Sequence, residues 1–218
     1  FLSKRWGKKS KALAQWCEEK GWGFCCYDVG GFGESEGRFM DYTLSDWVAD
    51  ARSVLETLRQ GPPITIVRNS LGGWIAWMMA QECPTVEKLI LIAPAFDGMG
   101  VRAREISADR RKRWDDTGWM PWDDDPAHKD WPLSWKWVEE SAGYWLSRIG
   151  EVRGVKTAIL HGLQDQAIHP RMSWQFVDEL LVRDPRYPVE LTLKMGDHRL
   201  SSPEHLDMFR RLVLDTRD

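Results

Sequence analysis

The sequence lacks any apolar run close to the roughly 18 residues that a membrane-spanning helix requires, so we expect no stable membrane insertion. Its net charge is only −3, from 30 basic and 33 acidic residues. There is no broad basic field of the kind that binds nucleic acid, and no polybasic segment of the kind that binds anionic lipid. The composition therefore argues against nucleic acid as a partner.

Metal and disulfide motifs are missing as well. The four cysteines (Cys17, Cys25, Cys26 and Cys83) form no C-x-x-C pair and no zinc spacing. Cys25 and Cys26 lie in an apolar run, where free cysteine behaves as a small hydrophobe, so we predict reduced core thiols. Gly31-Phe32-Gly33 falls short of a G-x-G-x-x-G nucleotide loop, and no H-E-x-x-H motif occurs. We expect no metal, no cofactor and a soluble intracellular protein of the cytoplasm or the mitochondrion.

Short apolar segments alternate with longer amphipathic ones along most of the chain. The predicted strands are Trp22–Val29, Ile64–Arg68, Lys88–Ala93, Thr157–His161 and Val189–Met195. The predicted helices are Ser10–Lys20, Ser45–Arg59, Leu71–Glu82, Arg171–Val182 and Pro203–Leu214. This alternation predicts an α/β fold, with a doubly wound, mostly parallel sheet covered by helices on both faces.

Residues 97–153 interrupt the alternation, and seven of the 14 tryptophans lie between Trp114 and Trp145. Long irregular insertions in compact domains are usually lids or binding loops, and binding pockets favour aromatic linings. We therefore predict core segments 1–96 and 154–218 and a tryptophan-rich cap at 97–153. The alternative is a helical excursion that packs its tryptophans onto the sheet and has no further role.

The clearest chemical candidate is Ser70, which follows the apolar strand Ile64–Arg68 and directly precedes the helix Leu71–Glu82. A serine on so tight a strand-to-helix turn presents its hydroxyl above the sheet edge, where the free N–H groups of the helix start also point. The N–H of Leu71 is the first of these. On this segment alone, Ser70 is equally well explained as a residue that caps the helix.

Two further strand ends supply the partners that a nucleophilic serine needs. Asp165 follows the strand Thr157–His161, and His198 follows the strand Val189–Met195. Sites in parallel sheets gather beyond the carboxyl ends of the strands, and the order Ser…Asp…His is that of α/β-hydrolases. We therefore predict Ser70 as nucleophile, His198 as base and Asp165 as the acid that orients the imidazole.

Several nearby residues compete for these roles. Asp97, after the strand Lys88–Ala93, is the alternative acid. His161 ends a strand before a glycine and is better explained as a residue that shapes the site than as a base. Asp197 is expected to be a surface or turn residue.

These segments resemble the α/β-hydrolase superfamily, and within it the mitochondrial abhydrolase-domain acyl-protein thioesterases and related bacterial esterases. The resemblance covers nearly the whole chain. It rests on Lys11–Ala14, Tyr27-Asp28 with Gly31–Gly37, Asn69–Trp74, Leu160–Asp165 and Gly196–Ser201. It implies the same three catalytic residues and a cap at 97–153 over an acyl pocket.

Two features depart from the family pattern. The family has glycine where this chain has Arg68, so we expect the side chain to overpack the turn by about 1–3 kcal/mol. The family loop that supplies the second oxyanion N–H is shorter here, which implies a donor at Lys4 or Arg5 beside that of Leu71.

The sequence therefore predicts a serine hydrolase that cleaves a carboxylic ester or thioester through an acyl-enzyme. Its partner is a small-molecule ester or thioester, or an acylated protein. Trp74, Trp119 and Trp122 are the residues predicted to line the apolar acyl site. The rival interpretation is a catalytically silent hydrolase-fold protein that binds a ligand or a partner.

Overall fold

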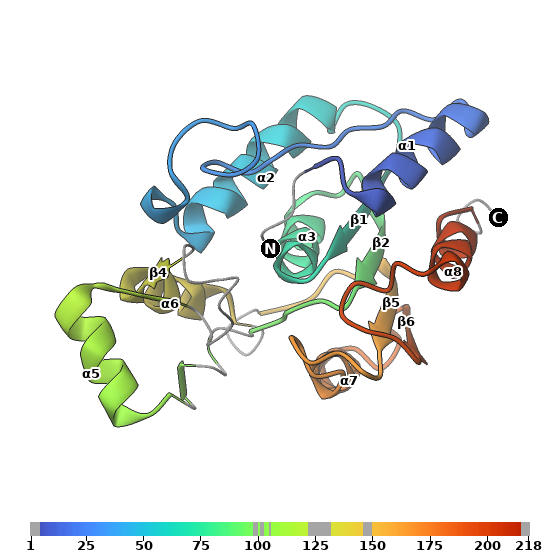
Figure 1. Ribbon diagram of the computed structural model, residues 1–218. Helices are drawn as coiled ribbons and strands as arrows, with labels where there is room; N and C mark the ends of the chain where they lie inside the picture. Colours follow the sequence, from blue (N-terminus) through green and yellow to red (C-terminus); the bar gives the residue numbers. More distant parts are fainter. Residues whose placement is uncertain are drawn as a thin grey trace.

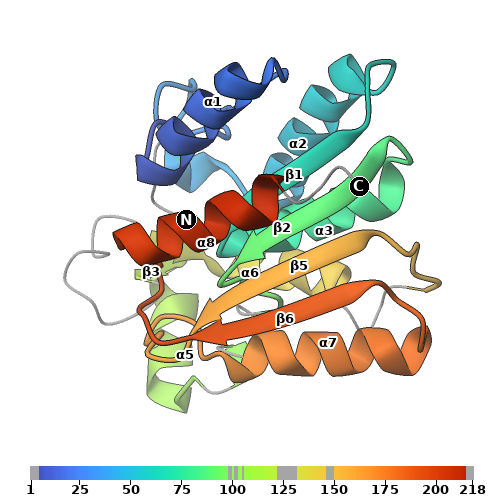
Figure 2. The ribbon, with the colours of Figure 1, turned by 90° about the vertical axis from the view of Figure 1, so that its right-hand side faces the viewer.

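A parallel sheet forms the centre of the computed structural model, which describes residues 5–97, 100, 103–104, 106–121, 132–145 and 150–214. Four strands make up the sheet in this described part, in the order β1-β2-β5-β6 (Figures 1 and 2). They are β1 (Ile64–Asn69), β2 (Val86–Ile92), β5 (Lys156–Gly162) and β6 (Val189–Lys194). All three pairings are parallel, which confirms the predicted fold class.

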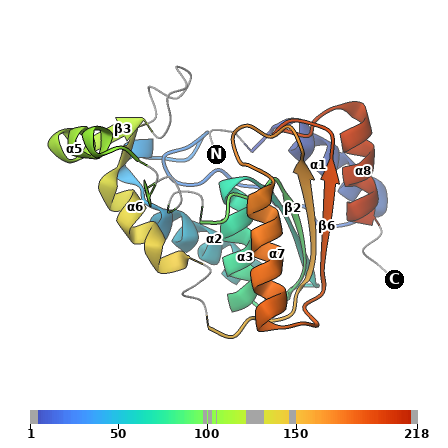
Figure 3. The same ribbon diagram turned by 90° about the horizontal axis from the view of Figure 1, so that it is seen from below.

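Helices cover both faces of this sheet (Figure 3). On one face lie α1 (Lys8–Lys20) and α8 (Pro203–Leu214), and on the other lie α2 (Leu44–Leu58), α3 (Leu71–Glu82) and α7 (Arg171–Arg183). Each face has its own apolar cluster, one containing Trp16 and Phe209, the other Trp77 and Phe176. The sheet is therefore doubly wound, as the alternation predicts.

The strand register brings the carboxyl ends of the strands to one edge. Asn69 pairs with Ile92, Ile92 with Leu160, and Leu160 with Thr192. Because the strands run in the same direction, the segments that follow β1, β5 and β6 all leave the sheet at this edge. Ser70, Asp165 and His198 belong to those segments.

One predicted strand is wrong. Residues Trp22–Val29 belong to no sheet in the described structure, and β1 pairs there only with β2. A strand forms only where a neighbouring strand satisfies its backbone groups, and none pairs with this segment in the described structure. The guanidinium of Arg68 lies 4.8 Å from the ring centroid of Tyr27.

This difference changes the environment of two cysteines. Cys25 is exposed and Cys26 is half-buried, because the segment that carries them does not enter the sheet. The prediction of core thiols is therefore wrong for Cys25, whereas Cys17 on α1 is buried. None of the four cysteines forms a disulfide within the described residues.

The elements between residues 97 and 153 lie away from the sheet, with α6 beside α2 and α5 farther out (Figures 1 and 3). They are α5 (Ala108–Thr117), β3 (Trp119–Pro121), β4 (Pro132–Ser134), α6 (Trp135–Ser141) and the short 3-10 helix η3 (Ala142–Tyr144); a second 3-10 helix, η1 (Phe39–Asp41), precedes α2. Trp114 and Trp137 are 4% and 1% exposed, and Trp137 packs edge-on against Trp47 of α2. These two tryptophans are packed inside the protein, but Trp137 packs against α2 and not onto the sheet, where the alternative interpretation places it.

The end of the insertion is fastened by Arg153. Its guanidinium donates hydrogen bonds to the carbonyl oxygens of Ala80, Cys83 and Val86, at distances between 2.5 and 3.1 Å. Ala80 lies near the end of α3, and Val86 starts β2. A single cation thus satisfies the carbonyls where helix α3 turns back into the sheet.

Arg153→Met should therefore lower the free energy of unfolding by about 2–4 kcal/mol, because hydrogen bonds to a charged group contribute more than neutral ones and their carbonyls would lose their partner. Urea denaturation measures the change. Arg59→Met is the control, since Arg59 forms an exposed pair with Glu56 and should change stability by less than about 1 kcal/mol. Equal effects of the two variants would contradict the assigned role.

Candidate active site

Ser70 occupies a strained turn between β1 and α3. Its φ is 52° and its ψ is −133°, a backbone conformation that residues other than glycine rarely adopt. The turn is held by the backbone, since Ser70 N–H donates to Ile92 O at 3.0 Å and Ala95 N–H donates to Ser70 O at 3.1 Å. Conformations of this kind cost about 1–3 kcal/mol and concentrate at functional sites.

The structure argues against a simple capping role for Ser70. The residue occupies the N-terminal cap position of α3, yet its side chain accepts no hydrogen bond from the first helical turn. The hydroxyl is therefore not used for capping, although the residue is only 7% exposed. Leu71 begins the helix, and its N–H is one of the first-turn donors that intrahelical bonding leaves free.

After Ser70, a small residue is needed at position 73 and not at position 72. A Cβ on Gly73 would lie 2.9 Å from Pro94 Cβ, whereas a Cβ on Gly72 would lie 3.5 Å from Arg68 Cδ, an ordinary contact. The overpacking expected from Arg68 is thus not found, because its guanidinium turns away over the ring of Tyr27. Gly73 is the position that sequence reasoning missed.

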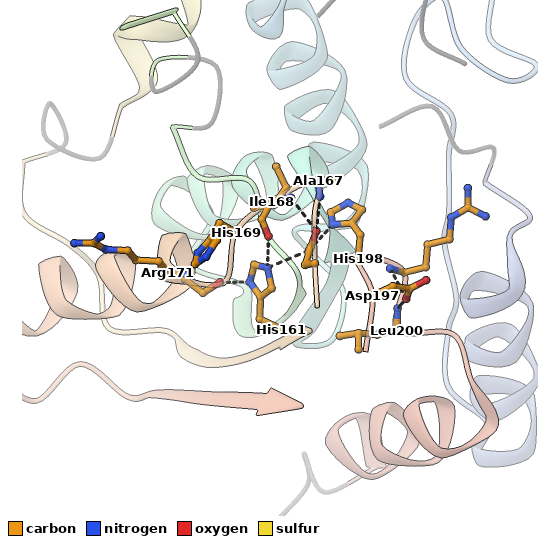
Figure 4. A network of polar contacts seen from close by, with 11 residues as sticks. His161, Ala167, Ile168, His169, Arg171, Asp197, His198 and Leu200 are labelled. Carbon is orange, nitrogen blue, oxygen red and sulfur yellow. Dashed lines mark hydrogen bonds and ion pairs between the residues drawn. The ribbon is translucent and has the colours of Figure 1, made fainter. Parts of the chain in front are cut away.

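Asp165 and His198 are in direct contact. Asp165 Oδ2 lies 2.6 Å from His198 Nδ1, and the carboxylate is buried while the imidazole is 25% exposed (Figure 4). Gly162 makes the contact possible, because a Cβ there would lie 2.4 Å from Gly196 O in the segment leading to His198. Asp165, not the alternative Asp97, is therefore the carboxylate beside this imidazole.

The carboxylate of Asp165 accepts hydrogen bonds from four donors. Its Oδ1 accepts from the N–H groups of Ala167 and Ile168 at 2.9 and 2.8 Å, and its Oδ2 lies 3.1 Å from His161 Nε2 as well as close to His198. Burial raises the pKa of Asp165, but the hydrogen bonds from His161, His198 and Ile168 outweigh it and hold the pKa well below its ordinary value. The group remains an anion.

The loop that carries His198 is also held in shape by its neighbours. Asp197 Oδ1 accepts hydrogen bonds from the N–H groups of Arg199 and Leu200 at 3.1 and 3.0 Å, so Asp197 holds the turn, as expected (Figure 4). Leu200 has a φ of 43° and is buried.

Among the described residues, Ser70 Oγ makes no hydrogen bond to His198, so the nucleophile–base contact stays a prediction.

The loop predicted to supply the second oxyanion donor differs from expectation. Arg5 N–H donates to Asp28 Oδ1 at 2.6 Å, and the Arg5 guanidinium pairs with Asp28 and Glu34. This N–H is thus already bound, which corrects the assignment of Arg5 as an oxyanion donor. The other candidate, Lys4, lies outside the described residues. The side chain of Asp28 is 2% exposed and binds both the N–H and the guanidinium of Arg5, a contact that the sequence did not predict.

Of the three tryptophans predicted to line an acyl site, one is buried, one is partly exposed and one lies outside the described residues. Trp74 is 1% exposed, and its indole N–H donates to Tyr144 O at 3.3 Å, so it belongs to the core and not to an open wall. Trp119 is 36% exposed at the start of β3. Trp122 lies outside the described residues.

The described part of the chain contains no cluster of three or more histidine, cysteine, aspartate or glutamate residues arranged to hold a metal ion. None of its helices is both long enough and apolar enough to cross a bilayer.

Strain at Ser70 gives a stability test. Ser70→Gly should raise the free energy of unfolding by about 0.5–2 kcal/mol relative to Ser70→Ala, because glycine adopts a positive φ without steric cost. Both variants lack the hydroxyl, so chemical denaturation of the pair isolates the backbone effect. A glycine variant no more stable than the alanine variant would show that the turn is unstrained.

The pKa of Asp165 gives a pH test. Because the pKa is depressed in the folded state, the stability that this carboxylate contributes is present above the unfolded value of about 4 and is lost as pH falls toward the native value. Asp165→Asn should cost about 1–3 kcal/mol at pH 7, and the gap to the unsubstituted chain should narrow below pH 4. Denaturation curves from pH 7 to pH 3 measure it. A constant gap would contradict the assignment.

Comparisons with known proteins agree with this architecture. A family model described as serine aminopeptidase, S33 (Hydrolase_4) matches residues 6–111. Palmitoyl-protein thioesterase ABHD10, mitochondrial, of Rattus norvegicus is 28% identical over 221 residues, which cover 100% of this chain and 73% of the relative. The corresponding Homo sapiens protein is 26% identical, with 100% and 71% covered.

Solved structures give the same result. Alpha/beta hydrolase domain-containing protein 10 from mouse matches with a TM-score of 0.86 and 25% identity, covering 99% of this chain and 85% of that one. A putative hydrolase from Agrobacterium vitis S4 matches with a TM-score of 0.87 and 26% identity, covering 100% and 85%. Est1E from Butyrivibrio proteoclasticus, at 20% identity and a TM-score of 0.78, shares the fold. The chain therefore has the α/β-hydrolase fold, and over nearly its whole length it is similar to the mammalian ABHD10 proteins and to the putative hydrolase of Agrobacterium vitis.

Proposed function

We propose that this α/β-hydrolase is a serine hydrolase that cleaves carboxylic esters or acyl-thioesters through an acyl-enzyme. The observation that carries the proposal is the 2.6 Å contact between His198 Nδ1 and Asp165 Oδ2, at the sheet edge where the strained turn of Ser70 also lies. That contact fixes the imidazole so that Nδ1 carries a proton and Nε2 keeps its lone pair.

In the proposed mechanism, Nε2 of His198 takes the proton of Ser70 as Oγ attacks the acyl carbonyl carbon. The Leu71 N–H stabilises the oxyanion, together with a second donor that we assign to the loop at Lys4. As the tetrahedral intermediate collapses, His198 returns the proton to the departing thiolate or alkoxide. Water, activated by His198, then attacks the acyl-enzyme and releases the acid. Asp165 stays ionised throughout and stabilises the imidazolium.

The substrate class is proposed from the relatives and from the cap. The ABHD10 relatives are named palmitoyl-protein thioesterases and mitochondrial proteins, and we extend the thioester class and that compartment to this chain. Residues 97–153 form the cap over the acyl site in this proposal. Trp119, which is partly exposed, is the described candidate for its lining.

The second candidate, a catalytically silent binding protein, is favoured by one observation. The Arg5 N–H is bound to Asp28 instead of being free to hold an oxyanion. An enzyme that lost one oxyanion donor would be slower by about 100- to 1,000-fold. The two candidates therefore differ in whether Ser70 is reactive.

Labelling with a fluorophosphonate probe decides between the two candidates. We expect stoichiometric modification that is lost in Ser70→Ala and kept in Ser53→Ala, since Ser53 is an exposed residue of α2. Ser70→Ala should also abolish hydrolysis of acyl thioesters, with a loss on the order of 10⁴-fold or more. Kinetics on matched esters and thioesters of increasing acyl length then identify the leaving group.

Absence of labelling in protein that is shown to be folded by its unfolding transition would favour the silent binding protein. Labelling that persists in Ser70→Ala would show that another nucleophile reacts.

A further inference from the structure

A second histidine, His161, makes a set of contacts that shows where one of its ring protons lies. The residue lies at the end of β5 and is 0% exposed. Its Nε2 lies 3.1 Å from Asp165 Oδ2 and 2.9 Å from Ile168 O, and both of these oxygens can only accept a hydrogen bond. Nε2 must therefore carry a proton, which it shares between the two acceptors.

The other ring nitrogen completes the assignment. His161 Nδ1 lies 2.7 Å from Ser173 Oγ, on the buried face of α7. A neutral ring accepts the hydroxyl proton of Ser173 at Nδ1 while it donates from Nε2, so each polar atom is satisfied without a charge on the ring.

The two imidazoles share one oxygen of Asp165. His161 and His198 both approach Oδ2, while Oδ1 is bound by the N–H groups of Ala167 and Ile168 (Figure 4). With two donors on each oxygen, rotation of the carboxylate would break hydrogen bonds on both sides. The orientation of Oδ2 toward His198 thus depends on a donor that has no contact with substrate.

We propose that His161 is a neutral positioning residue of the active site that locks the carboxylate of Asp165 toward His198 and lowers the basicity of that carboxylate. The proposal rests on the proposed function of Ser70, Asp165 and His198. A hydrogen bond from His161 draws electron density from Oδ2, which weakens that oxygen as a partner for a protonated His198. Without this bond, the protonated and inactive form of the base persists to higher pH.

Other titratable groups on the surrounding elements make their hydrogen bonds elsewhere. Asp197 accepts from the N–H groups of Arg199 and Leu200, and His169 accepts from the N–H of Arg171. Lys9 of α1 donates to Ser201 Oγ. Among the described residues, the hydrogen bonds of His161 thus connect it to Asp165, Ile168 and Ser173.

The test compares His161→Leu with His161→Gln. Leucine removes the donor, whereas the terminal amide of glutamine can place an N–H near the position of Nε2. We expect His161→Leu to lower kcat by about 10-fold or more with little change in KM, and to move the acid limb of the kcat/KM profile to higher pH. His161→Gln should restore most of kcat and the original pH limb. His169→Leu, an exposed histidine, is the control and should leave both unchanged.

Equal losses in the leucine and glutamine variants, or a loss with an unmoved acid limb, would show that His161 serves only packing. Thermal unfolding of each variant separates this outcome from misfolding. If His161→Leu does not fold, the same comparison is made between His161→Gln and the unsubstituted chain.

A spectroscopic measurement tests the inference without turnover. Ring ¹⁵N spectra of the full chain, assigned with single histidine variants, should show His161 as a neutral ring protonated at Nε2 across neutral pH. A ring protonated at Nδ1, or at both nitrogens, would overturn the inference. If Ser70 proves inert, the proposed function fails, while these spectra still decide whether His161 holds Asp165.

Discussion

Burying an ionised carboxylate is costly unless donors surround it, and the end of β5 is organised to meet that requirement for Asp165. The four donors come from a strand end, a turn and a neighbouring loop, so the arrangement ties three parts of the chain to one side chain. The imidazole of His198 owes its orientation to this anion. The contact between Asp165 and His198 also depends on the parallel strand register, because this register brings the segments after β1, β5 and β6 to one edge of the sheet.

Much of the fold follows from hydrophobic patterning. The strands β1, β2, β5 and β6 and the five long helices on the sheet all lie where apolar runs and amphipathic periods predict them. The prediction failed at Trp22–Val29, whose pattern is that of a strand. The composition of a segment indicates whether it suits a sheet. Whether it becomes a strand depends on hydrogen bonds to a neighbouring strand, and β1 does not pair with this segment in the described structure.

The candidate site was predictable to the extent that it consists of strand ends. Asp165 and His198 meet as the topology predicts, and His161 at the end of β5 contacts Asp165. Contacts that depend on three-dimensional packing were not predictable. The burial of Asp28, the approach of Ser173 to His161 and the need for glycine at position 73 leave no signature in the sequence, because each depends on a partner far along the chain.

The close approach at Gly162 has a consequence for how such a site changes over time. The distance between the acid loop and the base loop is set by two main chains in contact, Gly162 against the carbonyls of Gly196 and Asp197. Side chains around the rim do not set it. Substitutions elsewhere that leave these two main chains in place should therefore keep Asp165 and His198 in contact.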